Sequence, residues 1–168
     1  AETHALVRDT FIRCTTSPAI AESVASALVA AELAGKPGHG LRRVASYAAQ
    51  ALSGKVDGHA VPVATKPAAG SLKINAANGF AYPALDVMQA QLPALARHCG
   101  IAIAGISRSH HCGVAGVVVE KLADQGLVAL LFANTPAAMA PWGGNQALFG
   151  TNPIAFAAPC GDAGDAIV

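Results

Sequence analysis

Apolar side chains recur every three or four positions through the first 52 residues, which is the spacing of one buried helix face. This pattern predicts a short helix with Thr3 as its capping residue and an apolar face from Leu6 to Cys14. A second helix is expected between the start signal Ser17-Pro18 and the terminating Gly35. A third helix is expected over Leu41–Leu52. The beginning of the chain is therefore predicted to be helical.

The pattern changes after residue 60, where short continuous apolar runs alternate with helical stretches. The predicted strands are Val61–Lys66, Leu72–Asn75, Ile101–Ser107, Leu127–Ala133 and Ile154–Ala158, and the predicted helices are Tyr82–Cys99, kinked at Pro93, and Val114–Gln125. Such an alternation is typical of an α/β protein whose sheet is covered on both faces and is at least partly parallel. We expect a helical part of a first domain over residues 1–75 and a second domain over residues 76–168.

Composition changes this picture in one respect. Of the 168 residues, 53% are hydrophobic and only 12% are charged, about half the roughly 25% usual in globular domains. This balance excludes a disordered chain, and a net charge of +1 gives no basic surface for nucleic acid. No apolar run approaches the roughly 20 residues of a membrane-spanning helix. So little charge indicates that part of the surface is covered by something else.

The cysteines and the end of the chain bear on its context. The four cysteines are widely spaced, without a CxxC pair, which favours free thiols in a reducing cytoplasm over a disulfide framework. A turn signal at Gly161–Asp165 leads into Ala166-Ile167-Val168, which reads as the beginning of another strand. We therefore expect, with equal weight, a whole chain or one piece of a longer polypeptide.

The first candidate site is the turn before the third predicted helix. His39 is followed at helical spacing by Arg43 and Tyr47, so the three side chains are expected on one side of the helix start. Arg can hold a carboxylate with two hydrogen bonds while His exchanges a proton with the neighbouring oxygen or nitrogen. The alternative is a capping loop that exposes an unremarkable His and Arg to solvent.

The second candidate is the loop Ser107–Gly113, which contains His110, His111 and Cys112. It follows a buried strand and precedes a helix, the place where ligands gather in α/β sheets and where free N–H groups favour anions. Adjacent histidines point in different directions, so the two are not expected to serve one metal. Zinc held by Cys112, His111 and His39 lacks ligand-pair spacing but stays an alternative, as does a surface histidine pair.

The third candidate is the long loop between the predicted strands Leu127–Ala133 and Ile154–Ala158, which is rich in glycine, amides and hydroxyls. Such residues permit close approach of a ligand and supply hydrogen bonds, and a loop of this length in a compact domain is usually functional. Neither a P-loop nor a GxGxxG motif occurs, so any nucleotide would be bound in an unconventional way. The alternative is a loop that only bridges two strands.

Taken together, the three segments resemble the type 2 malate/L-lactate dehydrogenase family, which includes ureidoglycolate, sulfolactate and diketogulonate oxidoreductases and the cyclic-imine reductases. The resemblance is carried by His-Gly-x-x-Arg-x-x-x-Tyr at 39–47, Ser-x-His-x-Gly at 109–113, and Gly-Gly with Gly-Thr-Asn-Pro at 143–153. It implies an NAD(P)-dependent oxidoreductase with a mixed sheet flanked by helices and a nucleotide-binding fold that is not Rossmann. It further implies a cytoplasmic homodimer, and family chains that are considerably longer.

The resemblance also assigns roles to residues. His39 matches the family's acid/base, Arg43 its carboxylate clamp and His111 its second active-site histidine, and substrate contacts are expected from Arg43, Tyr47 and Thr151. Expected cofactor contacts are His111, Gly113, Asn134, Thr135, Pro141, Gly143, Gly144, Gly150, Thr151 and Asn152. Two positions depart from the family pattern, namely Gly38, where Ser is common, and Cys112, where an aromatic residue is expected.

The expected function is hydride transfer between NAD or NADP and C2 of a small 2-hydroxy/2-oxo acid or a cyclic 2-imino acid. Histidines with an ordinary pKa near about 6.5 could move the proton in either direction. The expected partners are the carboxylate substrate, a second chain carrying the C-terminal half, and a dimer mate. The alternatives are a cofactor- or partner-binding half-chain without activity of its own and a zinc hydrolase.

Overall fold

The computed structural model describes residues 1–161 and 165–168 and divides into two compact units, Ala1–Val114 and Ala115–Val168. This division by contacts lies nearly 40 residues beyond the domain boundary expected after residue 75. Because compact units and evolutionary domains are different things, the expected boundary stays a prediction. The mixed α/β character of the chain is confirmed.

The first unit begins with helices, as the apolar spacing predicts. They are α1 (Glu2–Arg13), α2 (Pro18–Leu33), the 3-10 turn η1 (Leu41–Arg43) and α3 (Val44–Leu52). Pro18 begins α2 directly after Ser17, as expected, but Thr3 is not a cap because α1 already begins at Glu2. The helices bury a shared core whose largest members are Phe11, Val24, Leu28, Tyr47 and Phe80.

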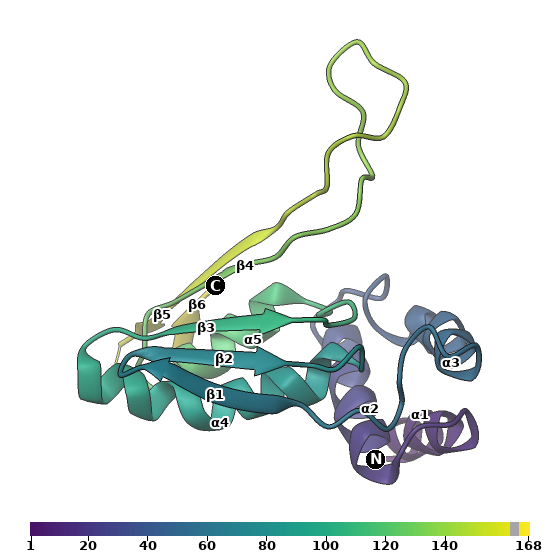
Figure 1. The fold of residues 1–168 in the computed structure, drawn as a ribbon, viewed down its shortest axis with the longest axis horizontal. Helices are drawn as coiled ribbons and strands as arrows, with labels where there is room; N and C mark the ends of the chain where they lie inside the picture. Colours follow the sequence, from purple (N-terminus) through teal and green to yellow (C-terminus); the bar gives the residue numbers. More distant parts are fainter. Residues whose placement is uncertain (162–164) are drawn as a thin grey trace. The chain divides into compact units, whose positions relative to one another are not determined.

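A three-stranded mixed sheet completes this unit (Figure 1). Its strands β1 (Val63–Ala68), β2 (Ser71–Asn75) and β3 (Ile103–Ser107) lie in the order β1-β2-β3. The pair β1–β2 is antiparallel and β2–β3 is parallel, with α4 (Ala81–Cys99) as the crossover helix between them. The helix α4 runs through Pro93 and packs against β2 and β3.

Only one face of this sheet is covered within the residues that the structure describes. Leu72 and Ile74 point to the buried side, whereas Val63 and Ile103 on the strands beside them are 60% and 71% exposed. Within the first unit by itself, the helices therefore cover one face of this sheet.

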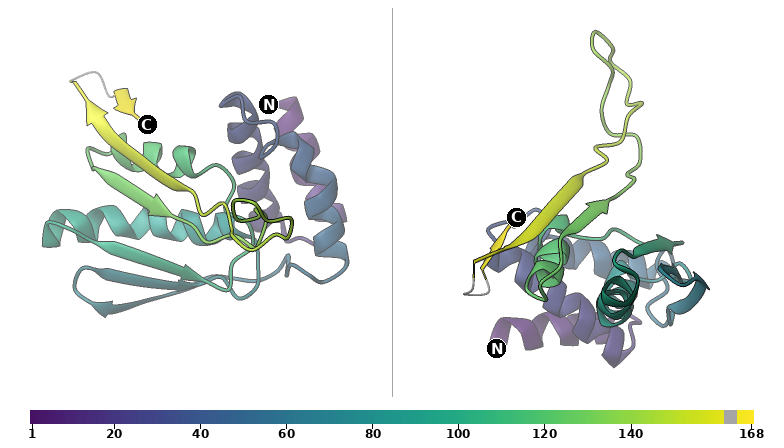
Figure 2. Two further views of the ribbon diagram at one scale, coloured as in Figure 1. Left: turned by 90° about the horizontal axis from the view of Figure 1, so that it is seen from above. Right: turned by 90° about the vertical axis from the view of Figure 1, so that its left-hand side faces the viewer.

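The second unit is an antiparallel sheet with one helix (Figure 2). The strands β4 (Ala129–Phe132), β5 (Ile154–Cys160) and β6 (Asp165–Ile167) follow the order β4-β5-β6, and α5 (Ala115–Ala123) packs against β4 and β5. The strand expected at the end of the chain is present as β6. Val119 and Ala157 are buried between helix and sheet, while the large side chains Leu130, Phe132, Ile154 and Phe156 are exposed.

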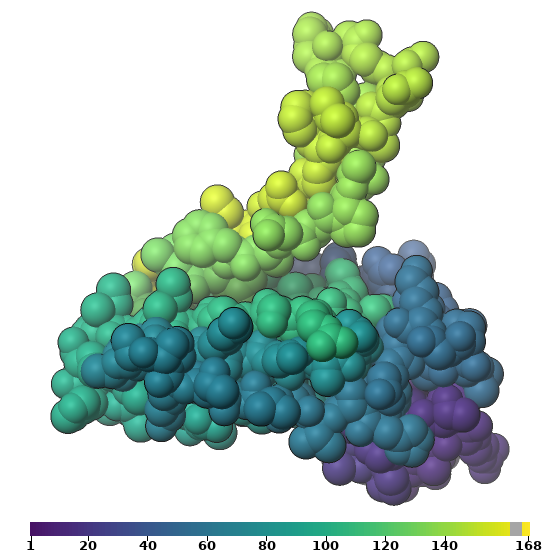
Figure 3. Space-filling view, in the orientation of Figure 1, coloured from purple at the N-terminus to yellow at the C-terminus, as the bar shows by residue number. Residues whose placement is uncertain are grey.

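The segment between β4 and β5, residues 133–153, extends these two strands as a narrow double loop, which the space-filling view shows in light green and yellow (Figure 3). An isolated antiparallel bridge between Met139 and Phe149 joins its two arms. Among the described residues, no helix combines the length and the apolar character needed to cross a bilayer.

Candidate active site

The turn that carries His39 is fixed by Glu32 of α2. The Leu41 amide donates a hydrogen bond of 2.9 Å to Glu32 Oε2, at the point where η1 begins. A Cβ atom on Gly40 would overlap the same carboxylate, so only glycine allows the turn to approach α2 this closely. The glycine after His39 in the sequence motif therefore has a steric reason.

Arg43 folds back on this turn. Its Nε donates a hydrogen bond of 2.6 Å to the Gly38 carbonyl, and the side chain is half-buried. This contact orients the guanidinium and leaves its two terminal nitrogens for a ligand, because guanidinium presents its donors as a rigid fork. The geometry suits the expected role of Arg43 as a carboxylate clamp, which stays a prediction.

The loop with the two histidines is held by backbone hydrogen bonds to the turn that follows β2. The amides of Asn78 and His110 donate to the carbonyls of Arg108 and Gly79, at 2.8 and 3.1 Å. These bonds continue the parallel pairing of β2 and β3 beyond the strands. The crossover through α4 thereby brings a loop more than 60 residues away in sequence to the helix α3.

Three predicted site residues meet where this loop reaches α3. The Tyr47 hydroxyl lies 2.6 Å from His111 Nδ1, and the rings of His39 and His111 stack with centroids 5.3 Å apart and planes at 28°. Tyr47 itself is buried, whereas His39 and His111 are partly exposed. The structure thus joins the first two candidate segments into one cluster, His39–Tyr47–His111, within the first unit.

The electrostatics of the cluster move the pKa of His111 away from its ordinary value. Burial, with smaller contributions from Arg43, His39 and His110, lowers the pKa of His111 from 6.5 to about 4. His111 is therefore neutral at pH 7, and the expectation of an ordinary pKa is wrong for this residue, because its ring is desolvated beside a fixed positive charge. Burial also raises the pKa of Tyr47, which keeps the phenol protonated and able to donate.

His110 has a different environment, which sequence reasoning did not resolve. Its Nε2 lies 3.0 Å from Gln50 Oε1, and its ring packs edge-on against Tyr47 and Phe80, with centroids 4.7 and 5.6 Å apart. Burial, together with Lys55 and Arg43, lowers its pKa. The two adjacent histidines therefore point in different directions, toward Tyr47 and Gln50. In the sequence, the only indication that α3 contacts both is that Tyr47 and Gln50 lie three residues apart, on one face of the helix.

The same loop carries Cys112, which was one of the three ligands in the zinc alternative. Within residues 1–161 and 165–168, no group of three or more His, Cys, Asp and Glu side chains is placed to hold a metal ion. Burial raises the pKa of the Cys112 thiol, so without a metal Cys112 is a neutral thiol at pH 7. All four cysteines are free. The cluster therefore favours acid–base chemistry over zinc chemistry.

Gly113 ends the loop in a conformation that suits glycine alone. Its φ is +74°, and a Cβ atom there would lie 2.9 Å from the Tyr82 hydroxyl and 3.0 Å from Tyr82 Cε1. From this position the Gly113 amide donates a hydrogen bond of 3.2 Å to His111 Nδ1. The Tyr82 hydroxyl is buried beside the Tyr47 hydroxyl, and burial, with a smaller contribution from Tyr47, raises its pKa. No local sequence signal marks Tyr82 as a neighbour of the histidine loop.

The third candidate loop belongs to the second unit. Thr135 Oγ1 accepts a hydrogen bond of 2.7 Å from the Thr151 amide, and the Thr135 amide donates one of 2.9 Å to Asn152 Oδ1. Gly150 packs against the Thr135 carbonyl so closely that a Cβ atom would overlap it. Four of the expected cofactor contacts, Thr135, Gly150, Thr151 and Asn152, are thus brought together at the base of the double loop.

Of the remaining expected cofactor contacts, Asn134, Pro141, Gly143 and Gly144 lie elsewhere on the same loop, whereas His111 and Gly113 belong to the first unit. Gly144 donates a backbone hydrogen bond of 2.9 Å to Pro141, and Gly143 between them has a φ of +75°, so the three form a turn near the tip. Asn134 is exposed beside Thr135. Their role in cofactor binding stays a prediction.

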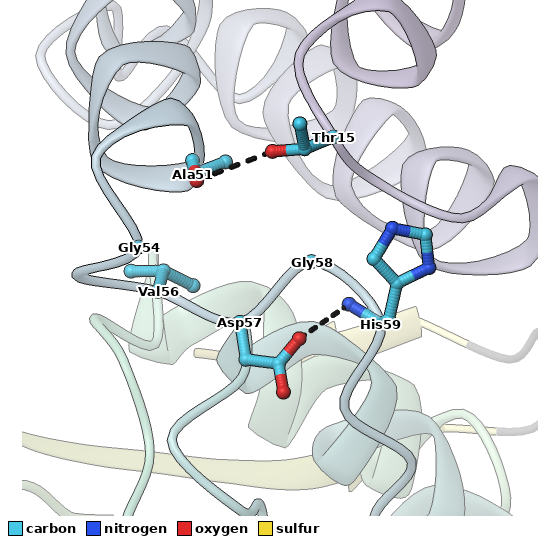
Figure 4. A pocket seen from close by; sticks show the side chains of 7 residues that line it. All are labelled: Thr15, Ala51, Gly54, Val56, Asp57, Gly58 and His59. Atoms are coloured by element: carbon cyan, nitrogen blue, oxygen red, sulfur yellow. Dashed lines mark hydrogen bonds between the residues drawn. The ribbon is translucent and has the colours of Figure 1, made fainter.

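A hollow of about 290 Å³ in the first unit contains none of the predicted site residues (Figure 4). Its lining comes from the ends of α1 and α3 and the segment that follows α3. The lining residues are Thr15, Ala51, Gly54, Val56, Asp57, Gly58 and His59. The His59 amide donates to Asp57 Oδ1 at 2.8 Å, so the carboxylate is used to shape the turn.

The fold and the site define an α/β protein with a paired-histidine centre, a neighbouring arginine, and neither of the common glycine-rich nucleotide motifs. The chain belongs to the malate/L-lactate dehydrogenase family, whose model matches residues 1–168. This membership confirms the resemblance seen in the three sequence motifs.

Individual relatives agree with the family. The chain is 50% identical over 140 residues to (2R)-3-sulfolactate dehydrogenase (NADP(+)) of Chromohalobacter salexigens, covering 83% of this chain and 41% of the relative. It is 43% identical to a Δ1-pyrroline-2-carboxylate/Δ1-piperideine-2-carboxylate reductase of Pseudomonas syringae pv. tomato, covering 92% and 45%.

Solved structures give the same picture. The Δ1-piperideine-2-carboxylate reductase from P. syringae pv. tomato superposes with a TM-score of 0.81 at 40% identity, covering 94% of this chain and 47% of that one. Malate dehydrogenase from Pyrococcus horikoshii superposes with a TM-score of 0.87 at 28% identity, covering 95% and 46%. The chain therefore spans about half the length of the relatives that it matches.

Proposed function

We propose that the protein containing this chain is an NAD(P)-dependent oxidoreductase that acts on C2 of a small carboxylate, either a 2-oxo/2-hydroxy acid or a cyclic 2-imino acid. The observation that carries the proposal is the cluster of His39, Tyr47 and His111 beside Arg43. It combines a group that can exchange a proton with a cation that can hold a carboxylate. The names of the relatives support both substrate types, since sulfolactate is a 2-hydroxy acid and pyrroline-2-carboxylate a cyclic imine.

The proposed roles follow from the contacts. Arg43, held by the Gly38 carbonyl, binds the substrate carboxylate and thereby sets the distance and face of the neighbouring C2. A bound NAD(P)H supplies the hydride. His39 gives a proton to the substrate oxygen or nitrogen, so that a C=O or C=N bond becomes an alcohol or amine.

The donor set of the second unit fits a nucleotide in its chemistry. Thr135, Thr151 and Asn152 gather hydroxyl and amide groups on an exposed loop, and Gly143 and Gly144 leave room for close backbone approach. We propose that these residues contribute to NAD(P) binding; for His111 and Gly113 in the first unit, a cofactor contact is proposed from the family resemblance alone. The choice between NAD and NADP is part of the test.

The exposed apolar side chains and the half-length match support a further part of the proposal. Leu130, Phe132, Ile154 and Phe156 lie on the uncovered side of β4 and β5. Patches of this kind mark surfaces that bind another chain or segment. We propose that the rest of the protein and a dimer mate cover them, in a cytoplasmic enzyme.

The test is oxidation of NADH and of NADPH with a panel of 2-oxo acids and cyclic imino acids. His39→Ala is expected to abolish turnover and to leave NAD(P)H binding intact. The matched control is His59→Ala, an exposed histidine in the hollow of the first unit, which should retain activity. Loss of cofactor binding in the His39 variant would contradict its proton-transfer role, and no oxidation with any substrate would refute the proposal.

A second candidate function is supported by the same half-length match. The chain could be a cofactor- or partner-binding part without activity of its own. The intact mass of the purified native protein under denaturing conditions distinguishes the two. A longer or second polypeptide that continues the family sequence favours the enzyme, and an inactive 168-residue species alone favours the binding part.

A further inference from the structure

The inference concerns the division of work between the two stacked histidines, and it rests on the proposed function. It begins with His111 Nδ1, which receives two contacts. The Gly113 amide lies 3.2 Å away with hydrogen-bond geometry, and the Tyr47 hydroxyl lies 2.6 Å away.

The first contact decides the tautomer. A backbone N–H can only donate, so Nδ1 of His111 must offer its lone pair and carry no hydrogen. The Tyr47 hydroxyl must then also donate to the same nitrogen. A neutral imidazole that accepts at Nδ1 carries its hydrogen on Nε2. Among the described residues, Nε2 of His111 has no hydrogen-bond partner, so this N–H is available to a ligand.

The second contact, from the Tyr47 hydroxyl, is held in place by the packing around Tyr47. Tyr47 is 2% exposed, packs against Phe80, and has the edge of the His110 ring against it. His110 is in turn held by Gln50, one helical turn after Tyr47 on α3. The two adjacent histidines are therefore both fixed by the same helix, and the phenol cannot leave its place without disturbing the core.

We propose that Tyr47 is a positioning residue which, with the Gly113 amide, holds His111 as the neutral Nε2-protonated imidazole, so that His111 donates a hydrogen bond to the substrate and His39 alone transfers the proton. During reduction, hydride from NAD(P)H arrives at C2, and the π electrons of the C=O or C=N bond move onto the oxygen or nitrogen. That atom takes its proton from His39, while His111 stabilises the developing negative charge through Nε2–H and keeps its hydrogen. This differs from the expectation that Tyr47 contacts the substrate.

The direct test is the tautomer of His111 in the full native protein. Long-range ¹H–¹⁵N spectra are recorded at pH 7, and His111 is assigned by the signals lost in His111→Gln. The expected pattern is that of a neutral imidazole with hydrogen on Nε2. A hydrogen on Nδ1, or an imidazolium at pH 7, would overturn the inference, and this measurement needs no variant of Tyr47.

The kinetic test compares Tyr47→Phe with Thr16→Val, which also removes a buried hydroxyl but from a residue outside the cluster. Tyr47→Phe should lower kcat at least about tenfold with KM for the carboxylate substrate unchanged, because a small displacement of a reacting group costs up to about 100-fold. It should also give His111 a mixture of tautomers. Thr16→Val should keep both kcat and the tautomer.

The outcomes separate the inference from the proposed function. A raised KM with unchanged kcat in Tyr47→Phe would make Tyr47 a substrate-binding residue and overturn the inference. Equal effects of Tyr47→Phe and Thr16→Val on the His111 signals would also overturn it, by showing a general packing effect. Absence of turnover in the wild-type protein would refute the proposed function, whatever the tautomer.

Discussion

Replacing Gly113 with alanine tests the packing that holds the site together. At a φ of +74°, an L-residue loses about 1–2 kcal/mol relative to glycine. The new Cβ would also lie 2.9 and 3.0 Å from two atoms of the buried Tyr82 ring, where ordinary contacts are 3.4–4 Å. Overpacking of this kind costs about 1–3 kcal/mol. We therefore expect Gly113→Ala to lower the free energy of unfolding by about 2–5 kcal/mol.

The matched control is Gly100→Ala. Gly100 follows α4 with a φ of +81°, and a Cβ atom there would meet nothing within 4 Å. This variant should show the backbone cost of about 1–2 kcal/mol alone. The assay is urea unfolding of both variants and the wild type, with unchanged m-values as the condition for comparison. The difference between the two variants isolates the collision with Tyr82.

A third variant examines the cause of that difference. Adding Tyr82→Phe to Gly113→Ala removes the atom at 2.9 Å but leaves Cε1 at 3.0 Å, so only part of the stability should return. Tyr82→Phe alone is the reference for this double variant, so that the loss of the contact between the Tyr82 and Tyr47 hydroxyls is subtracted. Equal destabilisation by Gly113→Ala and Gly100→Ala would refute the argument, since it would leave no steric contribution.

Three further predictions concern charge and hydrogen bonding. The pKa of His111 in the folded protein, about 4, lies below its ordinary value of 6.5, so the unfolded chain binds more protons between these two pH values. The free energy of unfolding should therefore fall as the pH drops from 6.5 to 4. Unfolding measured over this pH range should show a smaller fall in His111→Gln. Arg43→Gln should raise KM for the carboxylate substrate about 10- to 100-fold through loss of a charged hydrogen bond, while the exposed neighbour Arg42→Gln should not, as steady-state kinetics can measure. Thr135→Val removes the acceptor of a 2.7 Å hydrogen bond in the double loop and should weaken NAD(P)H binding in a fluorescence titration, whereas Thr65→Val on the exposed strand β1 should leave it unchanged.

The helices of the first unit could be predicted because their apolar spacing reports one shared core. Phe11 and Leu28 are fully buried at positions that the periodicity marks. The predicted start of the first helix, with Thr3 as its cap, was wrong because the helix begins at Glu2 and no side chain caps it. Thr3 is the capping residue type nearest to this start, so the sequence favoured it. The parallel pair β2–β3 was also foreseeable, since a helix between two apolar strands favours a crossover.

The contacts of the site could be predicted only in part. The motif spacing placed His39, Arg43 and Tyr47 together because they share one helix start. The bond from Tyr47 to His111 joins residues 64 positions apart and depends on the crossover through α4, which no local spacing encodes. The low pKa of His111 was unforeseeable for the same reason, because desolvation is a property of the assembled cluster.

Arg43 links the two halves of the proposed mechanism. Its guanidinium is the proposed clamp for the substrate carboxylate, and its charge is one of the causes that lower the pKa of His111. Arg43→Gln would therefore weaken substrate binding and at the same time allow His111 to take up a proton more readily. Since burial is the larger cause, His111 should stay neutral at pH 7 in this variant. A loss measured at pH 7 or above then reports the carboxylate contact, whereas a loss that grows only below pH 6.5 reports protonation of His111.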